Sequence, residues 1–109
     1  MTFVQRERSM TRVDATIQAR TGSSRLPGKV LRDLDGKPLL QYQIERIQQS
    51  QRIERVILAT TDRPQDDALA HLAESMGIDC FRGSEDDVIS RVCGALRAFD
   101  VETHAEFMG

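Results

Sequence analysis

The chain has 109 residues, with 15 Lys and Arg against 17 Asp and Glu, a formal net charge of −2 and 39% hydrophobic residues. This length fits one small domain, which excludes an active site that needs two full domains within the chain. The slight acidic excess argues against nucleic acid or an anionic membrane as a partner, because such binders usually carry a strong basic excess. The share of hydrophobic residues argues against a disordered chain.

Targeting signals and cysteines bear on the compartment. No apolar run is long enough for a transmembrane helix, and the polar residues 1–12 lack the apolar centre of a secretory signal. Cys80 and Cys93 do not have the spacing of a zinc site, so we expect two reduced, half-buried thiols. These features predict a cytoplasmic protein.

The first third of the chain is expected to contain one strand and one loop. Residues 1–12 show no hydrophobic periodicity, and we expect a flexible N-terminal arm. Small and β-branched residues predict a strand over 13–19, and Gly and Pro predict a loop over 20–29. A short extended piece is expected at residues 30–31, before a turn at residues 35–36.

Two helices and a strand are predicted over the middle of the chain. A helix is expected from Pro38 to about Ser50, because its aliphatic residues recur at helical spacing. The continuous apolar run over 55–60 is typical of a parallel strand buried on both faces. A second helix is expected from about Pro64, with Gly77 as its stop signal. The apolar faces of these helices are expected to consist of Leu40, Ile44 and Ile47, and of Ala68, Leu69, Leu72, Ala73 and Met76.

The last third continues the alternation of strands and helices. A strand is predicted over 78–82, and Ser84 with Asp87 resembles a capping box at the start of a third helix. The apolar stripe of that helix is expected at Ile89, Val92, Cys93 and Leu96, and residues 105–109 resemble the beginning of a further strand. The whole pattern predicts an α/β fold with a parallel sheet and right-handed crossovers.

The loop over 20–29 carries the chemistry that is easiest to interpret. It contains Arg20, Arg25 and Lys29 with no acid, together with glycines and hydroxyl side chains. Glycines let backbone amides approach a polyphosphate, and the cations and hydroxyls add donors. The spacing is neither that of a P-loop nor that of a dinucleotide fingerprint. A phosphate site at the end of the first strand and a solvated basic surface loop both remain open from composition alone.

Other polar groups have simpler interpretations. Glu85, Asp86 and Asp87 suit the first turn of a helix, where acids favour the macrodipole, better than a metal cluster. The same interpretation applies to Asp66 and Asp67. His71 is expected on the exposed side of its helix, and no role is assigned to His104.

A longer signature decides between the two interpretations of the loop. Residues 17–31 read IQARTGSSRLPGKVL and residues 35–39 read DGKPL, followed by LATTD at 58–62 and FRGSEDDV at 81–88. In this order the segments resemble the sugar-activating cytidylyltransferases, which include the acylneuraminate and 3-deoxy-manno-octulosonate cytidylyltransferases. The resemblance is greatest to the branch of the spore coat polysaccharide biosynthesis protein SpsF. It implies a three-layer, Rossmann-like nucleotidyltransferase fold, truncated to its N-terminal nucleotide-binding half at residues 13–109.

The resemblance also implies roles for individual residues. Arg20 and Lys29 would contact the triphosphate as catalytic cations, and residues 60–62 would lie near the base. The remaining nucleotide-binding positions would be Ala19, Gly22, Ser23, Ser24 and Arg25, with Thr60 and Asp62 at the base. A sugar hydroxyl would attack the α-phosphate of CTP and release pyrophosphate, with positioning and electrostatics dominating catalysis. Related nucleotidyltransferases that use other bases share this loop, so another nucleoside triphosphate and the identity of the sugar stay open.

The sequence departs from the family pattern at its end. The family places a Mg²⁺-binding aspartate directly after the glycine that matches Gly109, and that aspartate is not in this chain. Mg²⁺ is expected for the full family enzyme, but here it would bind only through the nucleotide phosphates. We therefore expect a fragment that retains the triphosphate loop with little or no transferase activity. The alternative is a non-catalytic nucleotide-binding module, or a module that forms a homodimer through an uncovered sheet edge.

Overall fold

The computed structural model describes residues 13–22 and 31–108. Four strands form a parallel sheet in the order β5-β4-β1-β6. Counted along the chain, this order is 3-2-1-4, so the direction of strand addition reverses between β1 and β6. The strands are β1 (Val13–Gln18), β4 (Ile53–Thr61), β5 (Asp79–Gly83) and β6 (His104–Met108). In parallel sheets, ligands bind beyond the carboxyl ends of the strands at such a reversal, which we call the switch point.

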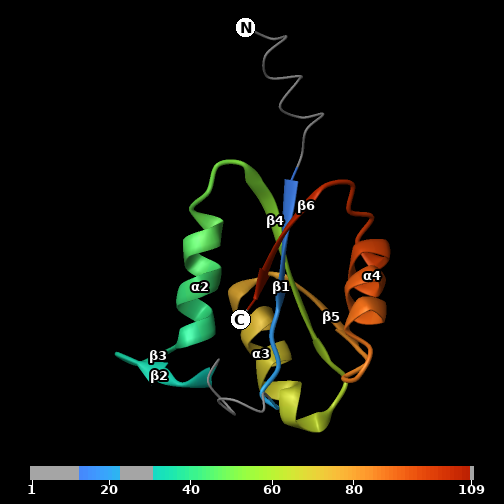
Figure 1. Cartoon of the computed structure of the whole chain (residues 1–109). Coiled ribbons are helices and arrows are strands. Elements are labelled where there is room, and N and C mark those ends of the chain that lie inside the picture. Colours follow the sequence, from blue (N-terminus) through green and yellow to red (C-terminus); the bar gives the residue numbers. More distant parts are fainter. Residues whose placement is uncertain (1–12, 23–30, 109) are drawn as a thin grey trace, which may run out of the picture.

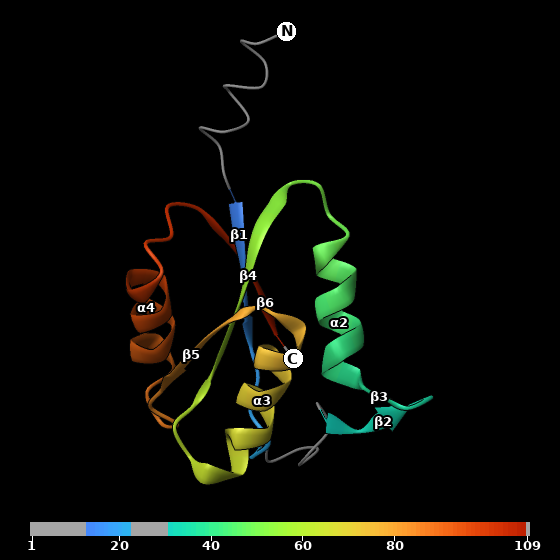
Figure 2. The same ribbon diagram turned by 180° about the vertical axis from the view of Figure 1, so that it is seen from behind.

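Helices cover both faces of the sheet and complete a three-layer α/β arrangement (Figures 1 and 2). Helices α2 (Leu39–Gln48) and α3 (Asp67–Met76) pack on one face, and α4 (Val88–Ala98) packs on the other. The core under α2 and α3 centres on Ala15, Ile17, Leu40, Ile44, Leu58, Leu69 and Ala73. The smaller core under α4 contains Ile57, Ala59 and Ala95, with Phe81 and Phe99 packed against it. The predicted α/β class with a parallel sheet is therefore confirmed.

A small hairpin, β2 (Asp33–Leu34) and β3 (Lys37–Pro38), precedes α2. Its turn contains Asp35 at φ 54° and Gly36 at φ 86°, a left-handed pair that matches the twist of a two-residue hairpin. The predicted turn is confirmed. Strand β2 begins two residues after the end of the extended piece that was expected there, and Leu31 is not part of a strand. The hairpin is held to α2, because the Tyr42 hydroxyl donates to the Leu34 carbonyl at 2.7 Å.

The apolar face predicted for the third helix is confirmed only in part, since Val92 and Leu96 are half-buried. Arg91 and Ala95 are the buried residues of α4, whereas Ile89 is 76% exposed and Cys93 is exposed. The physical reason is the close packing of this helix on β5. A Cβ added to Gly94 would lie 2.5 Å from the Phe81 ring, so this glycine lets α4 approach β5 closely along the face that carries Arg91 and Ala95.

Three smaller expectations also need correction. The Ser84 hydroxyl accepts from the Asp87 amide at 3.1 Å, as in a capping box, but the N-cap of α4 is Asp87, whose side chain accepts a hydrogen bond from the Ser90 amide at 2.9 Å. Cys80 is half-buried as expected, but Cys93 is not. Ala68 is exposed, although Leu69 and Ala73 of the same helix are buried, and Gly77 ends that helix at φ 71° as predicted. In the described parts of the chain, no helix has the length and apolar character needed to cross a membrane.

Candidate nucleotide site at the carboxyl edge of the sheet

Part of the predicted nucleotide site lies within the described residues. Strands β1, β4 and β5 end at one rim of the sheet, the carboxyl edge, which lies at the bottom of Figure 1. Of the predicted site residues, Ala19, Arg20, Gly22, Thr60 and Asp62 are at this edge or in the strands leading to it. Ser23, Ser24, Arg25 and Lys29 lie outside the described residues, as does the proposed arm at 1–12.

Arg20 and Gly22 form the described start of the predicted phosphate loop. The Ala19 amide donates to the Ala59 carbonyl at 3.2 Å, which extends the pairing of β1 with β4 to the edge. The next residue, Arg20, folds its guanidinium back so that Nη1 donates to the Gly22 carbonyl at 3.0 Å. A Cβ on Gly22 would lie 2.8 Å from Gln65 Nε2, which places Gly22 beside the end of the Gln65 side chain. The geometry places a cation directly beyond the end of β1.

The two residues predicted near the base differ in exposure. The Thr60 side chain is fully buried in β4, and its Oγ1 has no hydrogen-bond partner among the described residues. Asp62 is exposed, and its amide donates to the Gly83 carbonyl at 3.0 Å. Asp62 is therefore the member of this pair whose side chain is open to solvent.

Asp66 fixes the start of the loop to the neighbouring strand. One carboxylate oxygen, Oδ1, accepts hydrogen bonds from the amide and the hydroxyl of Thr21, each at 2.8 Å. The other oxygen accepts a hydrogen bond from the Thr61 hydroxyl at the end of β4. Burial acts to raise the pKa of the Asp66 carboxyl, but the hydrogen bonds from Thr61 and Thr21 outweigh it and hold the pKa below its usual value.

This finding corrects the interpretation of Asp66 as an acid in the first turn of a helix that favours the macrodipole. Asp66 is the last residue of a short 3₁₀ turn (Pro64–Asp66) and is completely buried. Its side chain makes no capping bond to α3, and it joins the ends of β1 and β4 instead. Asp67 fits the original interpretation better, because it is exposed in the first turn of α3 and pairs with Arg82 at 2.8 Å.

A second set of contacts braces the connection after β4. Arg82 Nε donates to the Thr61 carbonyl and Nη2 donates to the Arg63 carbonyl, both at 2.8 Å. Arg63 in turn pairs with Glu85 at 2.9 Å, and this ion pair raises the pKa of the Arg63 guanidinium. Glu85 therefore acts as a partner of Arg63, outside the helix whose first turn was expected to contain it.

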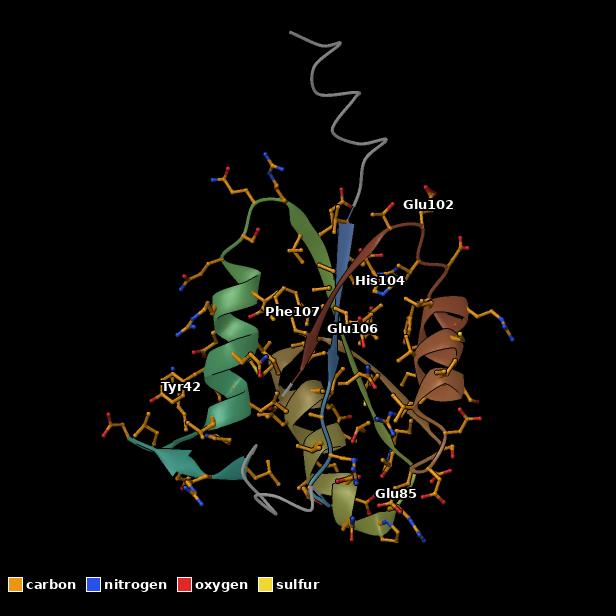
Figure 3. The ribbon with its side chains drawn as sticks, viewed as in Figure 1. Tyr42, Glu85, Glu102, His104, Glu106 and Phe107 are labelled. Carbon is orange, nitrogen blue, oxygen red and sulfur yellow. The ribbon has the colours of Figure 1, made fainter. Side chains whose placement is uncertain are left out.

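A polar chain crosses the α4 side of the sheet at the switch point. Arg91 of α4 donates to the Gln18 side-chain oxygen at 3.2 Å, and Gln18 donates through Nε2 to the Glu106 carboxylate on β6. Thr16 also donates to Glu106, at 3.4 Å, and His104 Nε2 lies 3.4 Å from the same carboxylate. Figure 3 shows His104 and Glu106 on the α4 side of β6, with Phe107 on the opposite side. These hydrogen bonds connect α4 and the end of β1, where the predicted phosphate site lies, to β6.

The described carboxylates do not fit a protein-built Mg²⁺ site. Such a site needs several oxygen ligands at one point, and the described residues contain no group of three or more Asp, Glu, His or Cys side chains that could hold a metal ion. Two acids near the edge already have partners, since Asp66 binds two threonines and Glu85 binds Arg63, which leaves Asp62 as an exposed carboxylate there.

Two cavities lined by described residues lie away from this edge. One of about 340 Å³ is lined by residues at the amino ends of β4 and β5, including Arg55 and Gly77. The other, of about 360 Å³, is an open hollow beside Cys93 and Val101. A phosphate site formed by cations and backbone amides at a strand end does not require such a cavity, so these two hollows do not compete with the carboxyl edge as the candidate phosphate site.

Comparison with known proteins identifies the family. The family model described as Cytidylyltransferase matches residues 15–108, which is nearly all of the described chain. The chain belongs to the cytidylyltransferase family. The resemblance found in the loop, in LATTD and in FRGSEDDV is thereby confirmed, because the match covers all of these segments.

Individual cytidylyltransferases and their relatives agree with this assignment. The chain is 41% identical over 86 residues to the spore coat polysaccharide biosynthesis protein SpsF of Bacillus subtilis, covering 75% of this chain and 36% of that protein. A cytidylyltransferase structure from Leptospira borgpetersenii superposes with a TM-score of 0.84 at 33% identity, covering 90% of this chain and 41% of that one. The structure of CMP:2-keto-3-deoxy-manno-octonic acid synthetase complexed with CTP superposes with a TM-score of 0.70 at 28% identity, covering 89% of this chain and 39% of that one. The chain thus spans about two fifths of the length of these proteins.

Sequence reasoning missed Asp66, Arg91 and Gln18, whose side chains lie behind the carboxyl edge that forms the candidate site. A buried carboxylate after a proline and a buried arginine in a helix look like surface residues when only the local pattern is read. The signal that was available is the position of Asp66 and Arg91 beside the two segments LATTD and FRGSEDDV, each of which ends a strand at the carboxyl edge.

Proposed function

We propose that this chain is the nucleotide-binding part of a CTP-dependent sugar nucleotidyltransferase that makes precursors of cell-surface polysaccharide. The observation that carries the proposal is the position of Arg20. It lies at the carboxyl end of β1, beside the switch point, at the start of the loop whose sequence matches the cytidylyltransferases. The likeness to a synthetase complexed with CTP supports the choice of nucleotide.

The reaction would be a displacement at the α-phosphorus of CTP. A sugar hydroxyl would form the new P–O bond and lose its proton, while the bond to the β-phosphate breaks and pyrophosphate leaves with the bonding electrons. Arg20 and Lys29 would stabilise the negative charge that grows on the leaving pyrophosphate. Asp66 would keep Thr21, and with it the backbone on either side, in one position for this task.

We further propose that the 109-residue chain binds the triphosphate without completing the transfer. The described carboxylates form no Mg²⁺ site, and the family relatives are more than twice as long as the matched region. Mg²⁺ would then accompany the nucleotide through its own phosphate oxygens.

Calorimetric titration with CTP tests the binding proposal. We expect wild type to bind, and Arg20→Ala and Lys29→Ala to bind at least about tenfold more weakly, because each loses a charge-assisted contact to phosphate. Arg52→Ala is the matched control, since Arg52 is exposed in the turn between α2 and β4, at the other end of the sheet. Wild type that gives no heat at millimolar CTP would refute the proposed function.

A transfer assay tests the proposal on activity. CTP and an acidic sugar are mixed with the chain, and released pyrophosphate is measured against the same mixture without protein. We expect pyrophosphate release at the background rate while CTP binding is intact. Release well above background would show that the chain is a complete catalyst.

A further inference from the structure

Arg91 is a buried cation without a carboxylate partner among the described residues. It is 3% exposed, and its guanidinium donates to the Ser84 carbonyl at 2.9 Å and to Gln18 Oε1 at 3.2 Å. The third donor, Nε, is buried and has no partner among the described residues. Both acceptors are uncharged, so burial of the positive charge is not balanced by an ion pair, which is costly for a protein interior.

The position of Arg91 relates it to the predicted phosphate loop. Ser84 follows β5 and Gln18 ends β1, so the guanidinium lies just behind the carboxyl edge, on the α4 side. Burial lowers the pKa of Arg91, and the positive charge of Arg20 lowers it further, while Asp66 and Glu85 act in the opposite direction. Arg91 binds Gln18, which lies two residues before Arg20, so both guanidinium groups belong to the carboxyl end of β1.

A structural brace would not need this charge. The hydrogen bonds from Arg91 join β1 to the segment after β5, but an uncharged donor could serve two uncharged acceptors without the cost of burying an ion. The stem of Arg91 is held tightly as well, because a Cβ on Gly83 would lie 3.1 Å from its Cγ. The charge is thus fixed in place without an ion-pair partner among the described residues, and an anion arriving at the edge would add to the weaker attraction of Asp66 and Glu85.

We propose that Arg91 is a second, buried cation of the triphosphate site, which together with Arg20 attracts the phosphates of the nucleotide to the carboxyl end of β1. It is a positioning residue that acts through its field and through its hold on Gln18, without touching the ligand. An anion bound at Arg20 balances both guanidinium charges. This inference rests on the proposed function, but pyrophosphate alone is a sufficient probe of it.

Two variants separate the charge from the packing. Arg91→Met keeps the length of the side chain and removes the charge, whereas Arg91→Lys keeps the charge and loses the planar donor set. We expect the Met variant to bind CTP and pyrophosphate about tenfold more weakly and the Lys variant to stay within about threefold of wild type. Binding by the Met variant should also depend less steeply on salt, because one fewer cation contributes to the attraction.

The matched control is Arg97→Met, because Arg97 is an exposed arginine in the last turn of the same helix. Its binding constants should equal those of wild type. Two-dimensional NMR spectra of each variant check the fold, and Arg91→Gln, which can still donate to the Ser84 carbonyl, replaces the Met variant if that variant does not fold.

The outcomes distinguish this inference from the proposed function. If Arg91→Lys and Arg91→Met weaken the binding of CTP and pyrophosphate equally, and the salt dependence of binding does not change, Arg91 is a structural brace. That result would overturn the role of its charge. Unchanged binding of CTP by the Met variant would overturn it as well, with the proposed function intact. A third outcome is that wild type binds pyrophosphate without preferring CTP, while Arg91→Met binds pyrophosphate more weakly as expected. This outcome would support the role of Arg91 and refute the choice of nucleotide.

Discussion

Asp66 Oδ1 accepts two hydrogen bonds from one residue, Thr21, through its amide and its hydroxyl at 2.8 Å each. The two residues are 45 positions apart in the sequence, and their hydrogen bonds connect the segment after β1 to the turn before α3. Since Thr21 lies between Arg20 and Gly22, the orientation of the predicted phosphate loop depends on a carboxylate that does not belong to the loop.

Replacing Asp66 with Asn should lower both stability and nucleotide affinity. The amide cannot accept from Thr21 and Thr61 with the strength of a carboxylate, and hydrogen bonds to a charged group are each worth roughly 1.5–3 kcal/mol. We expect a loss of about 2 kcal/mol in the free energy of unfolding, measured with urea, and a weaker affinity for CTP in calorimetry. Asp67→Asn, which removes an exposed ion pair with Arg82, should cost less than about 1 kcal/mol. Equal losses for the two variants would contradict the role given to Asp66.

The contribution of Asp66 should depend on pH in a defined direction. The folded state holds the pKa of this carboxyl below its usual value, so folding favours the ionised form. The stabilisation is then fully present above the unfolded pKa, roughly 3.9, and is lost as the pH falls toward the lower folded pKa. Urea unfolding of wild type and Asp66→Asn between pH 6 and pH 2.5 measures this directly. The two stabilities should converge at the acid end, and a gap that stays constant would disprove the linkage.

Gly94→Ala should destabilise the protein, against the usual effect of alanine in a helix. In an exposed helix interior the change gains roughly 1 kcal/mol. In α4 the added Cβ would lie 2.5 Å and 2.8 Å from atoms of the Phe81 ring, which packs against the core under this helix. Overpacking of this kind costs about 1–3 kcal/mol. Denaturant unfolding of the single variants and of the double variant with Phe81→Leu forms a cycle, in which the second change should recover much of the loss.

Cys93 should react with thiol reagents much faster than Cys80. Cys93 is exposed on α4, whereas Cys80 is half-buried in β5 and burial raises the pKa of its thiol. The thiolate is the reactive form, so both access and ionisation favour Cys93. A chromogenic disulfide reagent at pH 8 should show two phases with rates at least about tenfold apart. Cys93→Ser should retain only the slow phase, and loss of the slow phase instead would reverse the assignment.

The parts of the fold that depend on local chemistry are predictable from the sequence. The apolar run in β4, the helical spacing of Leu40 and Ile44, and the left-handed residues Gly36 and Gly77 each specify their structure within a few positions. The face of α4 was not predictable in this way. Its orientation depends on a small residue, Gly94, that accepts an aromatic ring from another strand.

The same distinction between local and distant contacts separates the residues of the candidate site that could be predicted from those that could not. The cations of the loop could be found because they are contiguous in the sequence and match a family signature. Asp66 and Arg91 could not, because their roles come from partners that are distant along the chain: Thr21 for the carboxylate and Gln18 for the guanidinium. A local pattern carries no record of such contacts, and both residues resemble ordinary surface charges until the sheet brings their partners to one edge.

The pairing of β1 with β6 has a consequence for how the protein forms. The two strands join residues about 90 positions apart, as in the hydrogen bond from Thr16 to Glu106. Closing so long a loop carries the largest entropic cost in this sheet, so we expect this pairing to form after that of β1 with β4 and of β4 with β5. Since β6 follows the other three strands in the chain, Gln18 can bond to Glu106 only after β6 has been synthesised. Within the described sheet, the switch point is therefore the part expected to be completed last.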